Sequence, residues 1–255
     1  MFERLRHFLG GRRAGDRVIA GMATMPSRAH TFREAFNSIV RQVDRLYIYF
    51  DGHNEIPEFV RSDPRVTPIL SRDQPGLRAN GKMLGLCLET GPFLFVCVDD
   101  DFLYPPNLVA HLKDGLASLN GRAVVGYHGS LLEKPLVRYE QNRKIFHYST
   151  ELPMKREVDV LGTGAVMFSS TALQFDVRRW PWVNMVDLGL AHEAAKARLP
   201  LICLSRHKDH IRVLEEGQPD SIFVALKRDD SRQTDLAHQL LALRAQTSYG
   251  RSQQG

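Results

Sequence analysis

The stretch FLFVCVDDDFLYPPN, residues 93–107, places six apolar residues directly before three adjacent aspartates. Like charges a few ångströms apart repel each other by about 1 kcal/mol per pair in water, and by more where solvent is thin. In an extended segment Asp99 and Asp101 project to one side and Asp100 to the other. Two carboxylates on one face can share a hard cation, and oxygen ligands favour Mg²⁺ or Mn²⁺. We therefore predict a buried strand that ends in a metal site, with a solvated acidic turn as the alternative.

Strand-type and helix-type segments alternate around this stretch. We expect strands at 17–24, 45–52, 65–70 and 93–98, and helices at 29–43, 77–90 and 105–119. This order predicts a mostly parallel sheet with helices on both faces, and the continuous apolar runs suit strands that are covered on both sides. Ligands of such sheets bind beyond the carboxyl ends of the strands. Asp51, the three aspartates and the TMPSR turn at 24–28 are expected there.

The second half of the sequence is less regular. We expect a strand at 123–132 that leads into a loop, and a polar, hairpin-like segment at 137–160. Further strands are expected at 164–170 and 200–205, and helices at 184–199 and 229–246, with a frayed end after residue 246. The sequence contains no internal repeat and no linker that would mark a second independent domain.

Composition places the chain among soluble globular proteins, with 255 residues, 43% hydrophobic and 25% charged. No apolar run approaches the roughly 20 residues that cross a membrane. Three cysteines without CxxC spacing suit reduced core residues in a cytoplasmic protein: Cys87, Cys97 and Cys203.

The net charge of +5 is partly concentrated at the amino terminus. The first 17 residues contain a cluster of arginines: Arg4, Arg6, Arg12, Arg13 and Arg17. Such a segment is expected either to contact the anionic inner face of a membrane or to form a solvated terminal helix. We expect no nucleic-acid partner, because no basic stripe is interleaved with aromatic residues.

VDDDFLYP, with VIAGMATMPSR and LYIYFDG upstream, resembles the nucleotide-sugar-dependent glycosyltransferases of the GT-A fold. It looks most like family-two-like bacterial enzymes of capsule or lipopolysaccharide gene clusters. VVGYHGSLL, VDVLGTGAVMF and NMVDLGLAHEAAKARLPLICL extend the resemblance over about residues 17–212. It implies an α/β, Rossmann-like, mostly parallel sheet flanked by helices, with a smaller β region on the acceptor side. It also implies metal-dependent transfer of a sugar from a nucleotide diphosphate, most often UDP, to a saccharide or lipid-linked saccharide in surface polysaccharide synthesis.

The resemblance assigns the ends of the first strands to the metal and the donor. The implied metal ligands are Asp99, Asp101 and one late histidine of RHKDH, either His207 or His210, of which we choose His210. The implied donor contacts are Thr24, Pro26 and Arg28 in the turn, Asp51 at the base or ribose, Asp100, and more loosely Lys82 with the nearby Asn80. For Lys82 the alternative is a solvated position on a helix, and for the histidines an exposed loop.

On the acceptor side the resemblance points to a loop, an aromatic residue and a base. Gly162, Thr163 and Gly164 would line the site, although they also suit an ordinary turn or bulge. Trp182, two residues after Trp180, is a candidate sugar platform, with core packing as the alternative. Asp187 would take the proton from the attacking hydroxyl, or merely complement the dipole at a helix start. Glu193 is expected to be solvated, and His128 is a weaker candidate contact.

The expected reaction is an inverting transfer, and three alternatives stay open. They are a retaining GT-A transferase, a nucleotidyltransferase that makes the activated sugar, and a non-catalytic nucleotide-sugar binder. The AGMATMPSR turn lacks the glycine-rich run of a nucleotidyltransferase. The expected organisation is a basic segment at 1–16, one catalytic domain at 17–228 and a terminal helix and tail at 229–255. The catalytic domain would divide into a nucleotide-binding half, about 17–120, and an acceptor half, about 121–228.

Overall fold

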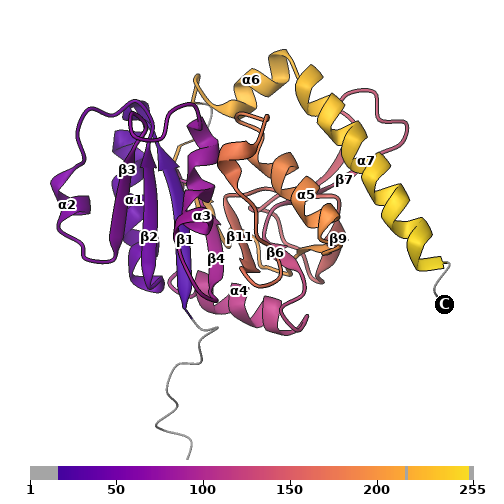
Figure 1. The fold of residues 1–255 in the computed structure, drawn as a ribbon, viewed down its shortest axis with the longest axis horizontal. Coiled ribbons are helices and arrows are strands. Elements are labelled where there is room, and N and C mark those ends of the chain that lie inside the picture. The colour runs from indigo at the N-terminus through magenta and orange to yellow at the C-terminus, as the bar shows by residue number, and fades with distance from the viewer. Residues whose placement is uncertain (1–16, 216–217, 253–255) are drawn as a thin grey trace, which may run out of the picture.

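The computed structural model describes residues 17–215 and 218–252 (Figure 1). Its centre is an eight-stranded sheet with the order β3-β2-β1-β4-β11-β6-β12-β9. The strands are β1 Val18–Thr24, β2 Arg45–Phe50, β3 Val66–Leu70, β4 Leu94–Val98, β6 Val124–Gly126, β9 Arg156–Val158, β11 Ala165–Ser169 and β12 Leu201–Cys203. All four strands predicted in the first part of the chain are present, and β1, β2 and β4 are buried as predicted, whereas in β3, at the edge of the sheet, only Leu70 is buried.

The sheet is mostly parallel, as predicted. β1 pairs in parallel with both β2 and β4, β2 with β3, and β6 with β12. Only β11, which lies between β4 and β6, and the edge strand β9 run the other way. The carboxyl ends of β1, β2 and β4 therefore meet at one edge, at the top of Figure 1.

Helices cover both faces of this sheet because the apolar side chains of each strand alternate between two cores. The α-helices are α1 Ala29–Ile39, α2 Glu58–Arg61, α3 Leu84–Leu88, α4 Leu108–Ala117, α5 Val186–Lys196, α6 Ile222–Arg228 and α7 Ser231–Ser252. On β1, Ala20 and Met22 face the core that α1 and α4 complete, whereas Ile19 faces the core of α3, α5 and α7. α7 lies along the outer side of α5 (Figure 1).

Two smaller antiparallel sheets form the predicted additional β region. One has the order β10-β7-β8 and the other pairs β13 with β5. Their strands are β5 Phe102–Leu103, β7 Gly129–Leu132, β8 Arg143–Phe146, β10 Val160–Leu161 and β13 Arg212–Val213. The α/β fold class with a mostly parallel sheet and a smaller β region is therefore confirmed.

Several local predictions were wrong. The run 123–132 forms two strands in different sheets, β6 and β7. The segment 137–160 is no hairpin, because β8 pairs with β7 while β9 pairs with β12. α7 continues to Ser252, and α6 was missed although Ser221 caps it by accepting a hydrogen bond from the Val224 amide. The sheet that each of these strands joins depends on a pairing partner that is distant in sequence.

The described ranges contain no helix that is both long and apolar enough to cross a membrane. The basic segment at residues 1–16, for which membrane contact was predicted, lies outside the described residues.

One close backbone approach fixes the segment that precedes α3. This segment is a 3₁₀ helix, η3, at Arg78–Met83; the others are η1 Pro26–Arg28, η2 Val40–Gln42 and η4 Val177–Arg179. A Cβ on Gly21 of β1 would lie 1.8 Å from the carbonyl oxygen of Lys82. Only glycine therefore lets η3 lie directly against β1, which places the Lys82 side chain beside the end of β4.

We expect Gly21→Ala to lower the free energy of unfolding by about 3 kcal/mol or more, because the contacting atom belongs to backbone that cannot rotate away. Gly121→Ala is the matched control, since a Cβ there meets nothing within 4 Å and only the positive φ of 72° opposes it. That strain costs about 1 kcal/mol. Urea denaturation of both variants measures the difference, and equal losses would contradict the close approach.

Candidate functional site

An ion pair occupies the end of β4. The Lys82 ammonium donates to Asp99 Oδ1 at 2.7 Å, and the Lys82 side chain is 8% exposed. Burial alone would lower the pKa of Lys82, but Asp99, Cys97 and Asp187 outweigh it and raise this pKa above its ordinary value. Lys82 is therefore a buried cation paired with Asp99, not the solvated helix residue of the alternative prediction.

Of the two following aspartates, Asp100 is buried and Asp101 is half-buried. Burial raises the pKa of Asp100 to about 7, with smaller contributions from Asp101 and Asp99 against the opposing Thr24 and Arg28. Burial and then Asp99 raise the pKa of Asp101 to about 6. Within the described chain, neither Asp100 Oδ2 nor the Thr24 hydroxyl has a hydrogen-bond partner of good geometry. The repulsion expected from the sequence is thus present. Lys82 pairs directly with Asp99, whereas Lys82 and Arg28 offset the raised pKa of Asp101 only in part.

The glycine loop lies between the acidic strand end and α5. Asp187 Oδ1, in the first turn of α5, accepts hydrogen bonds from the Thr163 amide at 2.8 Å and the Thr163 hydroxyl at 2.6 Å. A Cβ on Gly164 would lie 2.5 Å from Asp99 Oδ2. The loop therefore requires glycine next to Asp99, and Thr163 fixes the carboxylate of Asp187.

Tyr104 joins this loop to β4. The pairing of β11 with β4 ends at Ala165 and Val98, so Gly164 and Asp99 would form the next pair. The Tyr104 hydroxyl instead accepts from the Asp99 amide and donates to the Gly164 carbonyl, each at 2.7 Å. A side-chain hydroxyl thus replaces one backbone contact of the ladder. The sequence analysis missed this residue, although it stands inside VDDDFLYP.

The turn after β1 contacts a later part of the chain. Arg28 donates to Asp220 Oδ1 at 2.7 Å, and the Ser27 hydroxyl donates to Asp220 Oδ2 at 2.6 Å. The Leu214 amide donates to the Asp101 carbonyl at 2.7 Å, which continues the pairing of β13 with β5. Arg28 is therefore already paired with a carboxylate that the sequence analysis did not consider.

The region around Asp51 includes a residue that the sequence analysis did not name. Arg78 lies 3.4 Å from Asp51 Oδ2 and is held at a φ of 52°. The Asn80 amide donates to the Trp182 carbonyl at 2.5 Å, so η3 is also tied to the segment before α5. Pro26 lies beside Gly52: its Cδ is 4.0 Å from the position that a Cβ on Gly52 would occupy.

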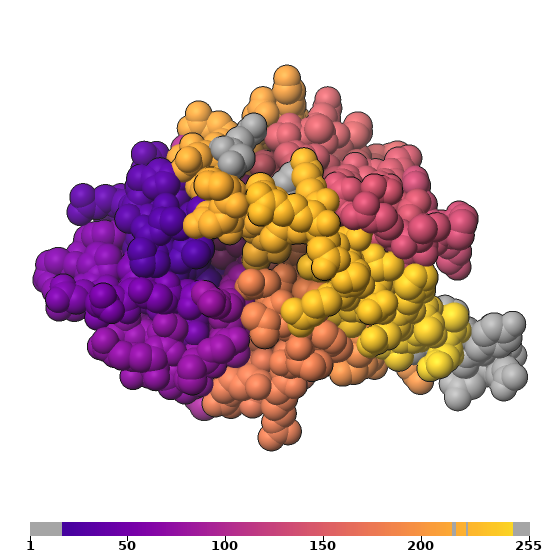
Figure 2. Space-filling view, turned by 90° about the horizontal axis from the view of Figure 1, so that it is seen from above, coloured from indigo at the N-terminus to yellow at the C-terminus, as the bar shows by residue number. Residues whose placement is uncertain are grey.

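The carboxyl edge of the sheet is hollowed. Figure 2 looks down on the carboxyl ends of the strands and shows a hollow between the indigo-to-purple first part of the chain and the orange and yellow later segments. β1, β2 and β4 end at this edge, and η3 and the start of α5 are joined to it by the contacts of Lys82 with Asp99 and of Asp187 with Thr163.

His210, the histidine predicted as a metal ligand, packs among aromatic rings. The His210 ring packs 4.7 Å from the Tyr127 ring and 5.8 Å from the His111 ring of α4. Among the described residues, no group of three or more His, Cys, Asp or Glu side chains is arranged to hold a metal ion. Asp99, Asp101 and His210 thus do not form a three-ligand set in this structure.

The tryptophans pack against α5. The Trp180 ring stacks on Phe175 at 4.9 Å between centroids, and its Nε1 donates to Glu193. Trp182 is half-buried, with its ring centroid 4.8 Å from that of His192. Trp180 is therefore a packing residue, and Glu193 is its hydrogen-bond partner and not the solvated residue predicted.

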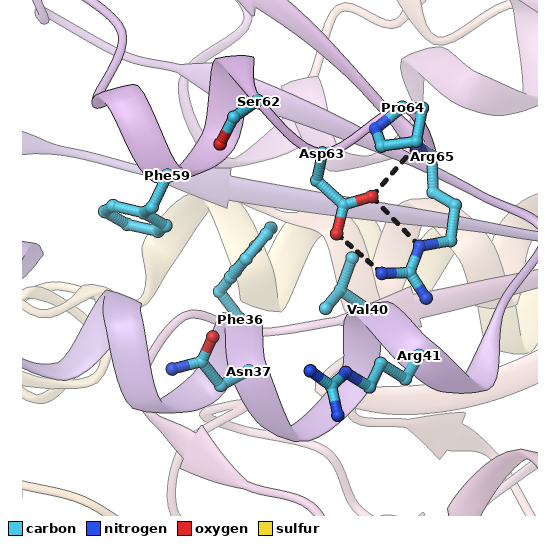
Figure 3. A pocket seen from close by; sticks show the side chains of 9 residues that line it. All are labelled: Phe36, Asn37, Val40, Arg41, Phe59, Ser62, Asp63, Pro64 and Arg65. Carbon is cyan, nitrogen blue, oxygen red and sulfur yellow. Dashed lines mark hydrogen bonds and ion pairs between the residues drawn. The ribbon is translucent and has the colours of Figure 1, made fainter.

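A separate pocket of about 540 Å³ lies away from the acidic strand end (Figure 3). It is lined by Phe36, Asn37, Val40, Arg41, Phe59, Ser62, Asp63, Pro64 and Arg65. Arg65 precedes β3, so the pocket is near the amino ends of the strands. Inside it, Arg65 donates twice to Asp63 at 2.9 and 2.7 Å, which neutralises both charges. We assign no function to it.

Comparisons with known proteins give partial structural matches. No protein-family model matches the chain, and no curated protein does. A crystal structure of glucosyl-3-phosphoglycerate synthase from Mycobacterium tuberculosis in complex with Mn²⁺, UDP-glucose and phosphoglyceric acid is 16% identical. It matches with a TM-score of 0.38 over 63% of this chain and 58% of that one. A complex of that synthase with Mn²⁺ and UDP-glucose is 23% identical, with a TM-score of 0.34 over 45% and 43%. The alignments thus span about half of the synthase chain.

The buried Asp100 carboxyl makes stability depend on pH. Its pKa of about 7 in the folded protein exceeds its ordinary value of 3.8, so the folded state binds the proton more tightly than the unfolded chain. This contribution is fully present below about pH 4 and is lost as the pH rises through about 7. We expect Asp100→Asn to raise the free energy of unfolding at pH 8 by about 2–4 kcal/mol, since one pKa unit corresponds to about 1.4 kcal/mol.

Urea denaturation at pH 5 and pH 8, without added divalent cations, measures this effect. Asp235→Asn on the exposed side of α7 serves as the control and should change neither value. A variant as pH-dependent as the wild type would show that Asp100 does not hold its proton.

Proposed function

We propose that the protein is a metal-dependent glycosyltransferase that moves a sugar from a nucleotide diphosphate to an acceptor hydroxyl. One observation carries the proposal: Lys82 pairs with Asp99 at the acidic end of β4 and lies close enough to the Thr163-bound Asp187 for that carboxylate to raise its pKa. Ligands of parallel sheets bind at the carboxyl ends of the strands. The partial likeness to UDP-glucose-binding synthases agrees with the proposal but adds no weight to it.

The carboxylates fit Mg²⁺ or Mn²⁺ in their chemistry. Asp99 and Asp101 offer oxygen ligands, and each electrostatically disfavours ionisation of its neighbours. A divalent cation relieves that repulsion, and such ions keep open positions for phosphate oxygens. Two protein carboxylates thus suffice if the donor completes the set, so a third protein ligand is not required. When bound, the ion neutralises charge on the departing diphosphate as a Lewis acid.

The donor lies, in this proposal, between the turn after β1 and η3. Thr24, Pro26 and Arg28 would border the nucleotide, and Asp51 would meet its base or ribose. Arg28 can reach the diphosphate only by exchanging its partner, because Asp220 holds its guanidinium at 2.7 Å. Arg78, 3.4 Å from Asp51, is an additional candidate at the nucleotide.

The proposed base is Asp187. One oxygen is held by both donors of Thr163, which orients the carboxylate towards the loop that faces Asp99. The base takes the proton of the acceptor hydroxyl as its oxygen attacks the anomeric carbon, while the bond to the diphosphate oxygen breaks. Lys82 lies close enough to raise the positive potential at both carboxylates. Direct attack from the side opposite the diphosphate inverts the anomeric carbon.

The finer assignments are also proposals. These are a UDP donor, a saccharide or lipid-linked saccharide acceptor, a role in surface polysaccharide synthesis, and a cytoplasmic location with membrane contact through residues 1–16. Trp182 and the Gly162–Gly164 loop would line the acceptor side. Of the alternatives, the retaining transferase shares the carboxylates of β4, and the non-catalytic binder lacks turnover.

We expect Asp99→Asn and Asp101→Asn each to weaken Mn²⁺-dependent binding of UDP at least tenfold, because each removes an anionic oxygen ligand. Calorimetric titration of UDP with and without Mn²⁺ measures it. Asp235→Asn keeps the same change of charge far from the site and should bind as the wild type does. Metal-independent UDP binding, equal in all four proteins, would contradict the metal assignment.

We expect Asp187→Asn to reduce turnover by about 10²–10⁴ with nearly unchanged affinity for UDP, the range typical for loss of a general base. Asn retains an oxygen that can accept both hydrogen bonds from Thr163, so the loop should keep its position. Glu193→Gln, on the same helix, is the control. Turnover is followed as UDP release from a set of UDP-sugars and acceptors.

The stereochemistry of the product separates the remaining alternatives. An α-linked donor should give a β-linked product, which the coupling of the anomeric proton in NMR reveals. A retained configuration, or an Asn variant as fast as the wild type, would remove Asp187 from the role of base.

A further inference from the structure

Four basic side chains gather beside the glycine loop, on the side away from Asp99. His128 follows β6, Arg143 begins β8, His147 follows β8, and Arg206 follows β12. The rings of His128 and His147 lie 5.2 Å apart between centroids, and Arg206 donates to the His147 carbonyl at 2.5 Å. We call these four residues the His128 cluster. Four chain segments distant in sequence thus bring positive or protonatable groups to one place.

Buried polar atoms in this cluster have no hydrogen-bond partner. Within the described chain, Arg143 Nε, Arg206 Nε and His128 Nδ1 are all inaccessible and unpaired. Neither guanidinium forms an ion pair with a described residue. The buried Arg206 donates through its Nη atoms to the carbonyls of Leu204 and His147, and the half-buried Arg143 lies over the Tyr139 ring, 4.3 Å from its centroid. Unpaired buried donors are rare in folded proteins, and a buried charge without a counter-charge is strongly unfavourable. The charge balance of the cluster therefore favours an anion.

The electrostatics of His128 agree with this geometry. Burial and then His147, Arg143 and Arg206 lower the pKa of His128 to about 3. Every charged neighbour that acts on this imidazole is basic, and no carboxylate offsets them. At neutral pH the ring is thus uncharged and can donate a hydrogen bond, while the surrounding potential is positive.

The cluster adjoins the proposed base. A Cβ on Gly162 would lie 2.7 Å from His128 Cδ2, and the Gly162 amide donates to the His128 carbonyl at 2.9 Å. Thr163, the next residue, holds Asp187. Tyr139, which carries Arg143 on its ring, is also close enough to Asp187 for that carboxylate to raise its pKa. A molecule that presents a hydroxyl to Asp187 could therefore reach the cluster with another group.

We propose that the His128 cluster binds an anionic group, a phosphate or a carboxylate, on the molecule whose hydroxyl is glycosylated. The planar guanidinium of arginine matches both anions with paired hydrogen bonds, and His128 offers one more donor. The anion site follows from the cluster alone, whereas its assignment to the acceptor rests on the proposed function. The acceptor is then a charged molecule and not a neutral sugar.

Binding of inorganic phosphate, in the presence of saturating UDP and Mn²⁺ and at constant ionic strength, tests the site by calorimetry. We expect Arg143→Gln and His128→Gln each to weaken phosphate binding about tenfold or more, with UDP binding unchanged. Arg122→Gln, an exposed arginine after α4, is the matched control and should bind phosphate as the wild type does. Arg206 is left intact, because its hydrogen bonds to backbone carbonyls also support the fold.

Two further arms identify the anion and its source. Acetate in place of phosphate distinguishes a carboxylate site from a phosphate site. Glycerol phosphate should bind in the presence of UDP with the same sensitivity to Arg143→Gln, whereas glycerol should not. Phosphate that competes with UDP, or that binds both variants as tightly as the wild type, would overturn the inference. Variant-sensitive phosphate binding without any UDP binding would support the anion site and remove the proposed function.

Discussion

The buried ion pair between Lys82 and Asp99 is the interaction on which the candidate site depends. Three adjacent carboxylates at the end of a buried strand repel one another, and burial together with this repulsion raises the pKa values of Asp100 and Asp101. Lys82 neutralises one of the three at 2.7 Å. Its own burial is tolerable only because carboxylates lie close by, since an isolated buried ammonium would lose its proton. Lys82 and Asp99 therefore compensate each other's charge at this strand end.

The position of this pair follows from the backbone. β4 delivers Asp99, and the contact between Gly21 and the Lys82 carbonyl fixes where η3 lies. The Tyr104 hydroxyl connects the same strand end to Gly164. Thr163, the preceding residue, hydrogen-bonds to Asp187 at the start of α5. Short contacts that involve the backbone thus hold Asp99 and Asp187, almost ninety positions apart in sequence, in one site. Such contacts leave little freedom for the site to change its shape without loss of packing.

The two sides of Thr163 differ in charge balance. Towards β4, the three carboxylates of Asp99–Asp101 exceed the two cations that act on them, Lys82 and Arg28, which suits a divalent ion and a donor that approaches with it. Towards β8, Arg143 and Arg206 have no carboxylate among the described residues, which suits an anion. An arrangement of this kind separates two ligands by charge, since each side repels what the other attracts.

The sequence by itself determined the first half of the fold and the identity of its acidic site. Apolar runs, helical periodicity and the Asp99–Asp101 strand end are local patterns, and local patterns survive in a single chain without partners. The pairings in the second half were not local. β11 inserts antiparallel between β4 and β6, and β8 and β9 join different sheets, so a hairpin was a reasonable but wrong expectation.

The tertiary structure alone decided which charges meet. Nothing in the sequence indicates that Lys82 pairs with Asp99, that Asp220 pairs with Arg28, or that Tyr104 bridges the strand end and the loop. These contacts join residues on separate elements, and their distances depend on how the helices pack on the sheet. The His128 cluster has the same origin, because its members come from four segments that only the folded sheets bring together. Residue type determined which groups are acidic, basic or hydrogen-bonding, and packing determined which of them contact one another.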